Sequence, residues 1–300
     1  MSTYKESEGF LCKAIESILN QSYQDFEFII ILDNPDNQLH IKIIQAYLKQ
    51  DKRIRFFINE KNMGLSKSLN KALSYAEGKY IARMDADDIA LSQRLEKQLA
   101  YLVEHNYDLI GGAVEVIDED EKILYNIKHV PTKVENIKKI VKYNQCIAHP
   151  TWFAKKTVFD KLNGYREIPF CEDYDFTLRA LMRGFKISNL DEIVLKYRMS
   201  KQSISRNNLL RQFLFMKYIT CEYQKGQIAN IEQANTYVEQ HYSANKEERY
   251  KKANVYFNQM LKNLQSKQCI KFISNGIKIV FTSFTFLQKI FRFFMVSIYK

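Results

Sequence analysis

The chain has few cysteines, and their spacing argues against two kinds of protein. Its 300 residues include only five: Cys12, Cys146, Cys171, Cys221 and Cys269. They are scattered, odd in number and never spaced as CxxC, so neither a disulfide framework nor a zinc site is expected. The polar start MSTYKESEGF lacks the apolar stretch of a secretory signal. These absences predict a protein of the reducing cytoplasm.

Long apolar runs are also missing. In the C-terminal tail the longest uncharged apolar-rich run, Ile279 to Gln288, has ten residues, whereas a membrane-spanning helix needs about 20. Acids are absent from Arg249 to Lys300, which contains ten Lys or Arg, so the first 248 residues carry 35 basic and 34 acidic residues. A near-neutral body with a basic tail is unlike a nucleic-acid-binding protein, so nucleic acid is not an expected partner.

The composition of this tail favours contact with a membrane. Aromatic and aliphatic residues are interspersed with Lys271, Lys278, Lys289 and Arg292, a pattern typical of a basic amphipathic helix on an anionic bilayer. Two other interpretations stay open: a helix docked on the protein's own core, or a contact within a homo-oligomer. We expect a peripheral protein at the inner face of the cell membrane.

The first two hundred residues alternate short β-rich runs with helical patterns, which predicts an α/β domain. The continuous apolar run Phe26–Leu32 suits a strand buried on both faces, as in a parallel sheet. Further strands are expected at Ile54–Ile58 and in KYIARM, each after a helical pattern. After about Arg206 only helical spacing remains. We therefore predict two regions, residues 1–205 and residues 206–300.

Polar residues follow the predicted strands, where ligands bind in open α/β sheets. Asp33 ends the first buried strand and is placed to accept hydrogen bonds from a ligand; the alternative is a simple Asx turn with Asn34 and Pro35. Asn62 and Gly64 precede a helix whose free backbone N–H groups favour a phosphate. Ordinary helix entry is the alternative for this pair.

Three aspartates follow the strand in KYIARM within four positions. Carboxylates two residues apart, such as Asp85 and Asp87, can share one hard divalent cation with the phosphates of a substrate. The alternative is that these acids cap a helix beginning near Leu91. Asp88 is the acid best explained as such a cap.

Two further segments carry candidate catalytic groups. Glu172, Asp173 and Asp175 stand at the start of a predicted helix, as partners of its dipole or as a general base for an acceptor hydroxyl. His149 lies in CIAHPTWF, where it is either part of the site or a core histidine satisfied by hydrogen bonds.

Taken in order, these segments resemble the family 2 glycosyltransferases of the GT-A fold, especially bacterial enzymes that build surface polysaccharides or lipid-linked glycans. STYKE is similar to the S-x-Y-N-E opening of that family, NMGLSKSLNKAL to its N-x-G-L segment, and ARMDADD contains its D-x-D motif. HPTWF with LNGYRE, and CEDYDFTLRAL, resemble its H-P-T and E-D segments. The resemblance extends over about Met1 to Asn207. It implies a mostly parallel, Rossmann-like sheet flanked by helices, followed by a helical C-terminal region.

The resemblance also implies a role for each matched residue. Asp173, with Glu172 beside it, would be the catalytic base, and His149 would lie near the donor sugar or acceptor. Asp87 and Asp85 would hold Mn²⁺ or Mg²⁺. The nucleotide-sugar donor would be bound by Thr3, Tyr4, Glu6, Asp33, Asn62, Gly64, Arg83 and Asp85.

The implied reaction is an inverting, metal-dependent transfer of a single sugar, from a UDP-sugar to a glycan or lipid-linked acceptor. A GT-A-like nucleotide-sugar-binding protein with little or no transferase activity is the alternative, because the chain departs from the family pattern. The apolar residues that usually precede S-x-Y are absent, LDNPDN lacks the usual Gly-Ser, and Ser200 stands where a histidine is frequent. The Q-x-x-R-W signature of processive synthases is not visible either.

Overall fold

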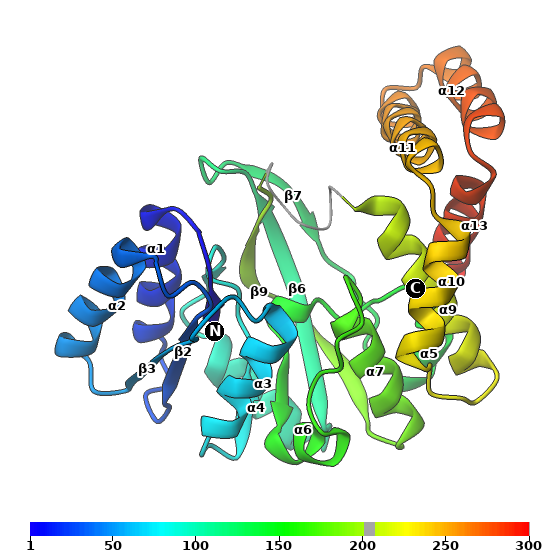
Figure 1. The fold of residues 1–300 in the computed structure, drawn as a ribbon. Coiled ribbons are helices and arrows are strands. Elements are labelled where there is room, and N and C mark those ends of the chain that lie inside the picture. Colours follow the sequence, from blue (N-terminus) through cyan, green and yellow to red (C-terminus); the bar gives the residue numbers. More distant parts are fainter. Residues whose placement is uncertain (201–207, 300) are drawn as a thin grey trace. The chain divides into compact units, whose positions relative to one another are not determined.

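The computed structural model describes residues 1–200 and 208–299, and these divide into two compact units (Figure 1). The first unit consists of Met1–Lys138, Gln145–Glu167 and Glu172–Ser200. The second combines the C-terminal helices with the short segments Lys139–Asn144 and Ile168–Cys171. The predicted boundary between residues 205 and 206 lies outside the described residues.

Three parallel strands in the order β1–β2–β3 form the first sheet: β1 (Ser2–Thr3), β2 (Phe28–Leu32) and β3 (Ile54–Ile58). All five residues of β2 are buried, as expected for an apolar run with neighbours on both sides. β1 pairs Ser2 with Ile31, and a parallel bridge links Ser2 to Asp85 on its other side. The main chain after the KYIARM segment is thereby brought next to β1.

The second sheet has the order β4–β8–β6–β9–β5, with β7 paired to β6. Its strands are β4 (Tyr80–Ala82), β5 (Ile89–Ala90), β6 (Leu109–Ile117), β7 (Ile123–Ile127), β8 (Phe153–Lys155) and β9 (Ile187–Arg198). Among the strand pairs of the described residues in this sheet, only β6·β9 is parallel, and the others are antiparallel. The α/β class is thus confirmed, but a mostly parallel arrangement holds only for β1 to β3.

Helices flank both sheets of the first unit (Figure 1). Helix α1 begins after Ser7, whose side chain accepts a hydrogen bond from the Phe10 N–H, as an N-cap residue does. The helices are α1 (Glu8–Leu19), α2 (Gln38–Gln50), α3 (Leu65–Tyr75), α4 (Arg94–Glu104), α5 (Val134–Ile140), the 3₁₀ turn η1 (His149–Thr151), α6 (Lys156–Leu162) and α7 (Glu172–Met182).

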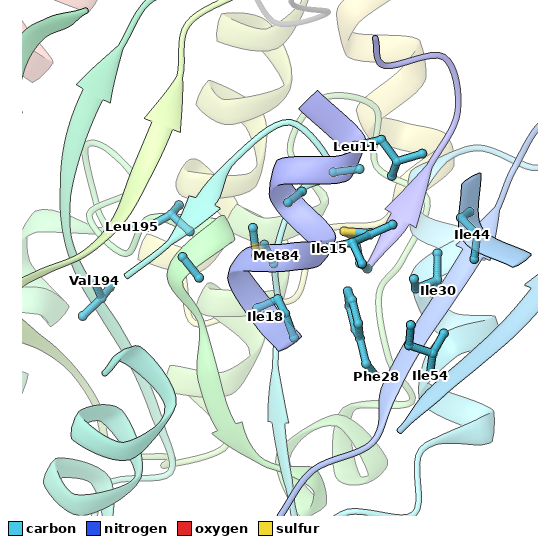
Figure 2. Packing of buried hydrophobic residues seen from close by; sticks show 14 of the residues in the cluster. Leu11, Ile15, Ile18, Phe28, Ile30, Ile44, Ile54, Met84, Val194 and Leu195 are labelled. Atoms are coloured by element: carbon cyan, nitrogen blue, oxygen red, sulfur yellow. The ribbon is translucent and has the colours of Figure 1, made fainter. Parts of the chain in front are cut away.

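A hydrophobic core joins α1 and α2 to β2, β3, β5, β6 and β9 (Figure 2). Helix α1 contributes Leu11, Ile15 and Ile18, which recur at helical spacing on its buried face. Alternate residues of β2, Phe28 and Ile30, pack against them, since successive side chains of a strand point to opposite faces. The core fixes the ends of β2 and β4, where the candidate site lies.

The second unit is helical, as predicted for the C-terminal region. It contains α9 (Leu209–Gln224), α10 (Ile231–His241), α11 (Ala244–Gln265), α12 (Cys269–Thr282) and α13 (Phe284–Tyr299). The tail therefore forms two helices, which meet at the buried Ser283. None of the described helices combines the length and the apolar character needed to cross a bilayer.

Candidate active site

Asp33 is buried at the end of β2 and holds the loop before α3. Its carboxylate accepts hydrogen bonds from the Asn59 side chain at 2.7 Å and from the backbone N–H groups of Met63 and Gly64, both at 2.8 Å. Gly64 is the N-cap residue of α3 and has a φ of +83°, which favours glycine. Asp33 thus fixes the conformation of the Asn62–Gly64 loop. These hydrogen bonds reach residues 30 and 31 positions away, so they are not those of a local Asx turn.

We expect Asp33→Asn to lower the free energy of unfolding by about 1–3 kcal/mol. The reason is that the amide nitrogen of asparagine cannot accept a hydrogen bond from a backbone N–H, as the carboxylate oxygen does. Urea denaturation followed by circular dichroism measures this loss. The matched control is Asp36→Asn, at an exposed position of the loop between β2 and α2. Equal stability of the two variants would contradict this interpretation of Asp33.

A tight turn follows β1 and presents Tyr4 to solvent. The Glu6 carboxylate accepts hydrogen bonds from the Thr3 hydroxyl at 2.6 Å and from the Tyr4 N–H at 2.9 Å. The buried Thr3 hydroxyl also lies 3.0 Å from Nδ1 of His40. Held in this way, the Tyr4 ring is exposed beside the end of β2, where a planar base could stack on it.

Arg83 lies below the acidic cluster and is almost fully buried. Two of its nitrogens contact the two carboxylate oxygens of Asp85, each at 2.5 Å, a bidentate pair. Within the described part of the chain, its Nε atom has no hydrogen-bond partner. The charge of Arg83 also acts on the carboxyl groups of Asp87, Asp88, Glu172 and Asp173, lowering their pKa values against the effect of burial.

Asp85, Asp87 and Asp88 form one cluster, in which ligand oxygens lie within 4.8 Å of one another. Burial, followed by the charges of Asp85 and Glu6, raises the pKa of Asp87 to about 7. Asp88 is fully buried, and its pKa is raised well above the ordinary range by burial and by the two neighbouring aspartates. These acids repel one another, an arrangement that a cation would relieve.

The prediction that Asp88 caps a helix is wrong. Helix α4 begins at Arg94, with Gln93 as its N-cap residue. The short strand β5 stands between and pairs with β9, which places Asp88 beside the end of that strand. Its Oδ1 accepts the Arg198 N–H at 2.8 Å, and no described residue hydrogen-bonds its Oδ2. Asp88 therefore belongs to the acidic cluster.

Arg198, which the sequence analysis did not identify, holds the main chain of the aspartate cluster in place. Its fully buried side chain donates from Nε to the Asp87 carbonyl at 2.8 Å and stacks on Phe10 at 4.1 Å. The same guanidinium also bonds the carbonyl groups of Asp118 and Glu119. Arg198 thus ties the aspartate turn to the end of β9.

Glu172 and Asp173 are the first residues of α7, where backbone N–H groups favour negative charge. Burial and the neighbouring Asp173 raise the pKa of Glu172 to about 7, and burial also raises that of Asp173. Asp85 is near enough to raise the pKa of Glu172 further. Asp175 has a different part: it is buried between Arg166 and Arg179 and holds α7 in place.

His149 is buried in η1 and satisfies the expectation for a core histidine. Its Nε2 lies 2.9 Å from the Tyr165 hydroxyl, and its ring packs edge-on against Trp152. Burial and the charge of Arg83 lower the pKa of His149 well below its usual range, which keeps the ring neutral. The pKa of Tyr165 is affected by the charges of Arg83, Asp85, Glu172 and Asp173. His149 is therefore linked to these charged residues through its hydrogen bond with Tyr165.

A cavity of about 1010 Å³ lies elsewhere in the same unit. Its lining includes the beginning of β2, all three residues of β4 with the following Arg83 and Met84, and residues of α3 and α4. None of Asp85, Asp87 and Asp88 lines the cavity, although Arg83, which pairs with Asp85, does.

Comparison with known proteins decides the family. The sequence profile of glycosyl transferase family 2 matches residues 1–176. The chain belongs to that family. It is 41% identical over 219 residues to an uncharacterized glycosyltransferase of Methanocaldococcus jannaschii, covering 73% of this chain and 76% of the relative. It is 35% identical to the O-antigen biosynthesis glycosyltransferase WbnJ of Escherichia coli, covering 69% and 85%.

The fold of this glycosyltransferase is shared with known structures. The crystal structure of S. aureus TarS, residues 1–349, in complex with UDP-GlcNAc has a TM-score of 0.60 and covers 94% of this chain and 90% of that one, at 15% identity. The predicted family, the GT-A fold and the assignment as an enzyme are confirmed. The roles of single residues stay predictions.

Proposed function

We propose that this glycosyltransferase transfers one sugar, with inversion, from a nucleotide-sugar to a glycan or lipid-linked acceptor in the synthesis of a surface polysaccharide. The observation that supports this most is the pairing of two acidic groups around Arg83: the Asp85–Asp87–Asp88 cluster and the Glu172–Asp173 pair. A displacement at an anomeric carbon needs charge stabilisation on the leaving side and a base on the acceptor side. The first group suits the former and the second the latter.

The donor nucleotide would lie over the ends of β1 and β2. The exposed Tyr4 ring offers a stacking face, while Thr3, Glu6 and Asp33 keep the turn and the Asn62–Gly64 loop in shape. We propose a UDP-sugar, which agrees with the UDP-GlcNAc bound to the structurally similar TarS. Arg83 and Asp85 would then face the ribose and diphosphate.

The acidic cluster fits a divalent metal, Mn²⁺ or Mg²⁺. Its donors are carboxylate oxygens, which hard cations prefer, and Asp88 contributes a buried oxygen with no hydrogen-bond donor among the described residues. Asp87 and Asp88 would hold the ion, with Asp85 shared between it and Arg83. When bound, the metal would supply Lewis-acid stabilisation of the diphosphate charge.

Asp173 would act as the base, with Glu172 beside it. The acceptor hydroxyl forms a bond to the anomeric carbon as its proton passes to the Asp173 carboxylate. The bond from the anomeric carbon to the diphosphate oxygen breaks in the same step, and the electron pair leaves with the nucleoside diphosphate. Attack opposite the leaving group inverts the configuration at the anomeric carbon.

We further propose that residues 1–205 carry the transfer chemistry and that the C-terminal region, residues 206–300, serves acceptor access. The relation to an O-antigen enzyme supports an acceptor in surface polysaccharide synthesis, and such acceptors are glycans or lipid-linked glycans. The enzyme would work at the inner face of the cell membrane as a peripheral protein. Thermal-shift measurements with a panel of nucleotide-sugars and Mn²⁺ test donor binding. UDP-sugars should raise the melting temperature, and stabilisation by no nucleotide-sugar would contradict the proposal.

Arg198→Lys is expected to raise the Mn²⁺ concentration needed for half-maximal activity about 10–100-fold, because the loss of a residue that supports a metal ligand usually weakens metal affinity by this factor. Lysine keeps the charge but cannot bond the Asp87 carbonyl and the Asp118 and Glu119 carbonyls together. The readout is the Mn²⁺ concentration for half-maximal activity. Arg55→Lys, which alters an ion-pair site at the beginning of β3, is the control. An unchanged Mn²⁺ requirement in Arg198→Lys would show that Arg198 only stabilises the fold.

A further inference from the structure

Helix α12 is apolar on the side that faces away from the protein. Asn275 and Ile279, one turn apart, form its buried side. The opposite side carries a row of residues that are 53–86% exposed and recur at helical spacing: Ile270, Ile273, Ile277, Val280 and Phe281. A helix that buries one face usually exposes polar residues on the other, so this row is unusual for a surface in water.

Helix α13 repeats this arrangement. Phe286 is fully buried and makes edge-on ring contacts with Tyr250 and Phe257 of α11 at 5.0 and 5.8 Å. The exposed side again carries apolar residues seven, ten and fourteen positions apart, which are 58–75% exposed: Phe284, Phe291, Phe294 and Ile298. Both tail helices are therefore docked by one face and apolar on the other, and we call their exposed residues the apolar stripe.

Basic side chains border the stripe of α12. Lys271 and Lys278 are exposed and lie seven residues apart, so they share one flank of the helix. Nζ of Lys278 also lies 5.5 Å from the centre of the Tyr256 ring of α11, although the side chain stays exposed. Lys289 and Arg292 are used inside the unit instead: Lys289 lies over the rings of Tyr250 and Phe286, and Arg292 donates to the Tyr143 carbonyl. Of the four basic residues in the predicted amphipathic tail, only Lys271 and Lys278 are therefore placed to contact a membrane.

We infer that the apolar stripe of α12 and α13 lies in the interfacial layer of an anionic bilayer, with Lys271 and Lys278 at the level of the headgroups. This placement buries both rows of exposed side chains and lets the lysines contact lipid phosphate. At 14 and 16 residues, the two helices are suited to lie on the bilayer and are too short to span it. The inference rests on the proposed function, because membrane binding would bring the enzyme to lipid-linked acceptors.

Charge argues against a second copy of the chain as the occupant of this face. From Arg249 to Lys300 the sequence has ten basic residues and no acid. Two such faces packed together would bring lysines near lysines without a carboxylate to pair with them. An anionic membrane supplies the missing negative charge.

Vesicle sedimentation of the full chain tests the inference. Wild-type protein should bind phosphatidylcholine vesicles that contain phosphatidylglycerol, and should bind pure phosphatidylcholine much more weakly. The triple variant Ile273→Ser/Ile277→Ser/Phe281→Ser should bind the anionic vesicles at least about tenfold more weakly. Lys271→Gln/Lys278→Gln should lose about fivefold per charge. The matched control is Ile123→Ser/Leu124→Ser, which changes exposed apolar residues of β7 and should bind like wild type.

The triple variant should keep the wild-type circular dichroism spectrum, because its three positions are exposed. Equal vesicle binding by wild type and triple variant would overturn the inference. The inference would also be overturned if the wild-type protein did not bind vesicles but formed a dimer that is lost in the triple variant. Binding is measured without donor or acceptor, and transfer to a soluble acceptor is measured without vesicles, so failure of one leaves the other test intact.

Discussion

Replacing Asp87 with asparagine is expected to remove nearly all sugar transfer, with a fall in kcat of about three orders of magnitude. The reason is that Asp87 would hold the metal that stabilises the leaving diphosphate, a contribution worth several kcal/mol, where each factor of ten corresponds to about 1.4 kcal/mol. The amide is close to the carboxylate in size, so the fold should persist. Release of UDP from a UDP-sugar, measured at saturating Mn²⁺, checks this prediction.

Two comparisons make the Asp87 result specific. Asp36→Asn removes an exposed carboxylate from the same unit and should retain wild-type turnover. The Asp87→Asn variant should also lose the Mn²⁺-dependent part of donor binding in a titration calorimeter. Wild-type turnover in Asp87→Asn would show that the acidic cluster is not the metal site.

Asp173→Asn is expected to lower turnover by about 10²–10⁴-fold, the usual contribution of a general base. Donor binding should change little, because Asp173 would act on the acceptor hydroxyl. This contrast with Asp87→Asn separates the two acidic groups by their effects on binding and chemistry. Asp160→Asn, which removes a surface carboxylate paired with Lys156 in α6, is the control. Loss of donor affinity in Asp173→Asn equal to that in Asp87→Asn would contradict the assignment.

The same pair sets the expected pH dependence. A base must be deprotonated to act, and burial together with Asp173 raises the pKa of Glu172 to about 7, while burial also raises that of Asp173. Activity should therefore rise as the pH increases through about 7 and fall below it. A pH–rate profile of the wild type that is flat from pH 5 to 8 would show that no such carboxyl pair controls the reaction.

Much of the first unit could be predicted from sequence because its signals are local. Strand β3 lies where the apolar run Ile54–Ile58 predicts it, and the buried run around β2 ends beside Asp33 as expected. The acids of the D-x-D segment come directly after β4, at a strand end of the kind where ligands bind in α/β sheets. Such features depend on periodicity and strand ends, which one sequence displays.

The contacts behind the site could not be predicted in this way. Arg198 bonds Asp88 across 110 residues, and the two-residue β5 that aligns them is too short to show any alternation. The same holds for the tail, where Lys289 and Arg292 face inward while Lys271 and Lys278 face outward. Charge and hydropathy identify such residues, but only packing decides which side of a helix is buried.

The most direct test of the account is UDP release by the wild-type chain from a panel of UDP-sugars, measured with Mn²⁺ and again with excess EDTA. The account predicts release from at least one UDP-sugar with Mn²⁺, stimulation by an acceptor, and loss of release in EDTA. Equal release in EDTA would contradict the metal site. Donor binding without turnover of any nucleotide-sugar, in the presence of acceptor extracts, would contradict the transferase mechanism itself.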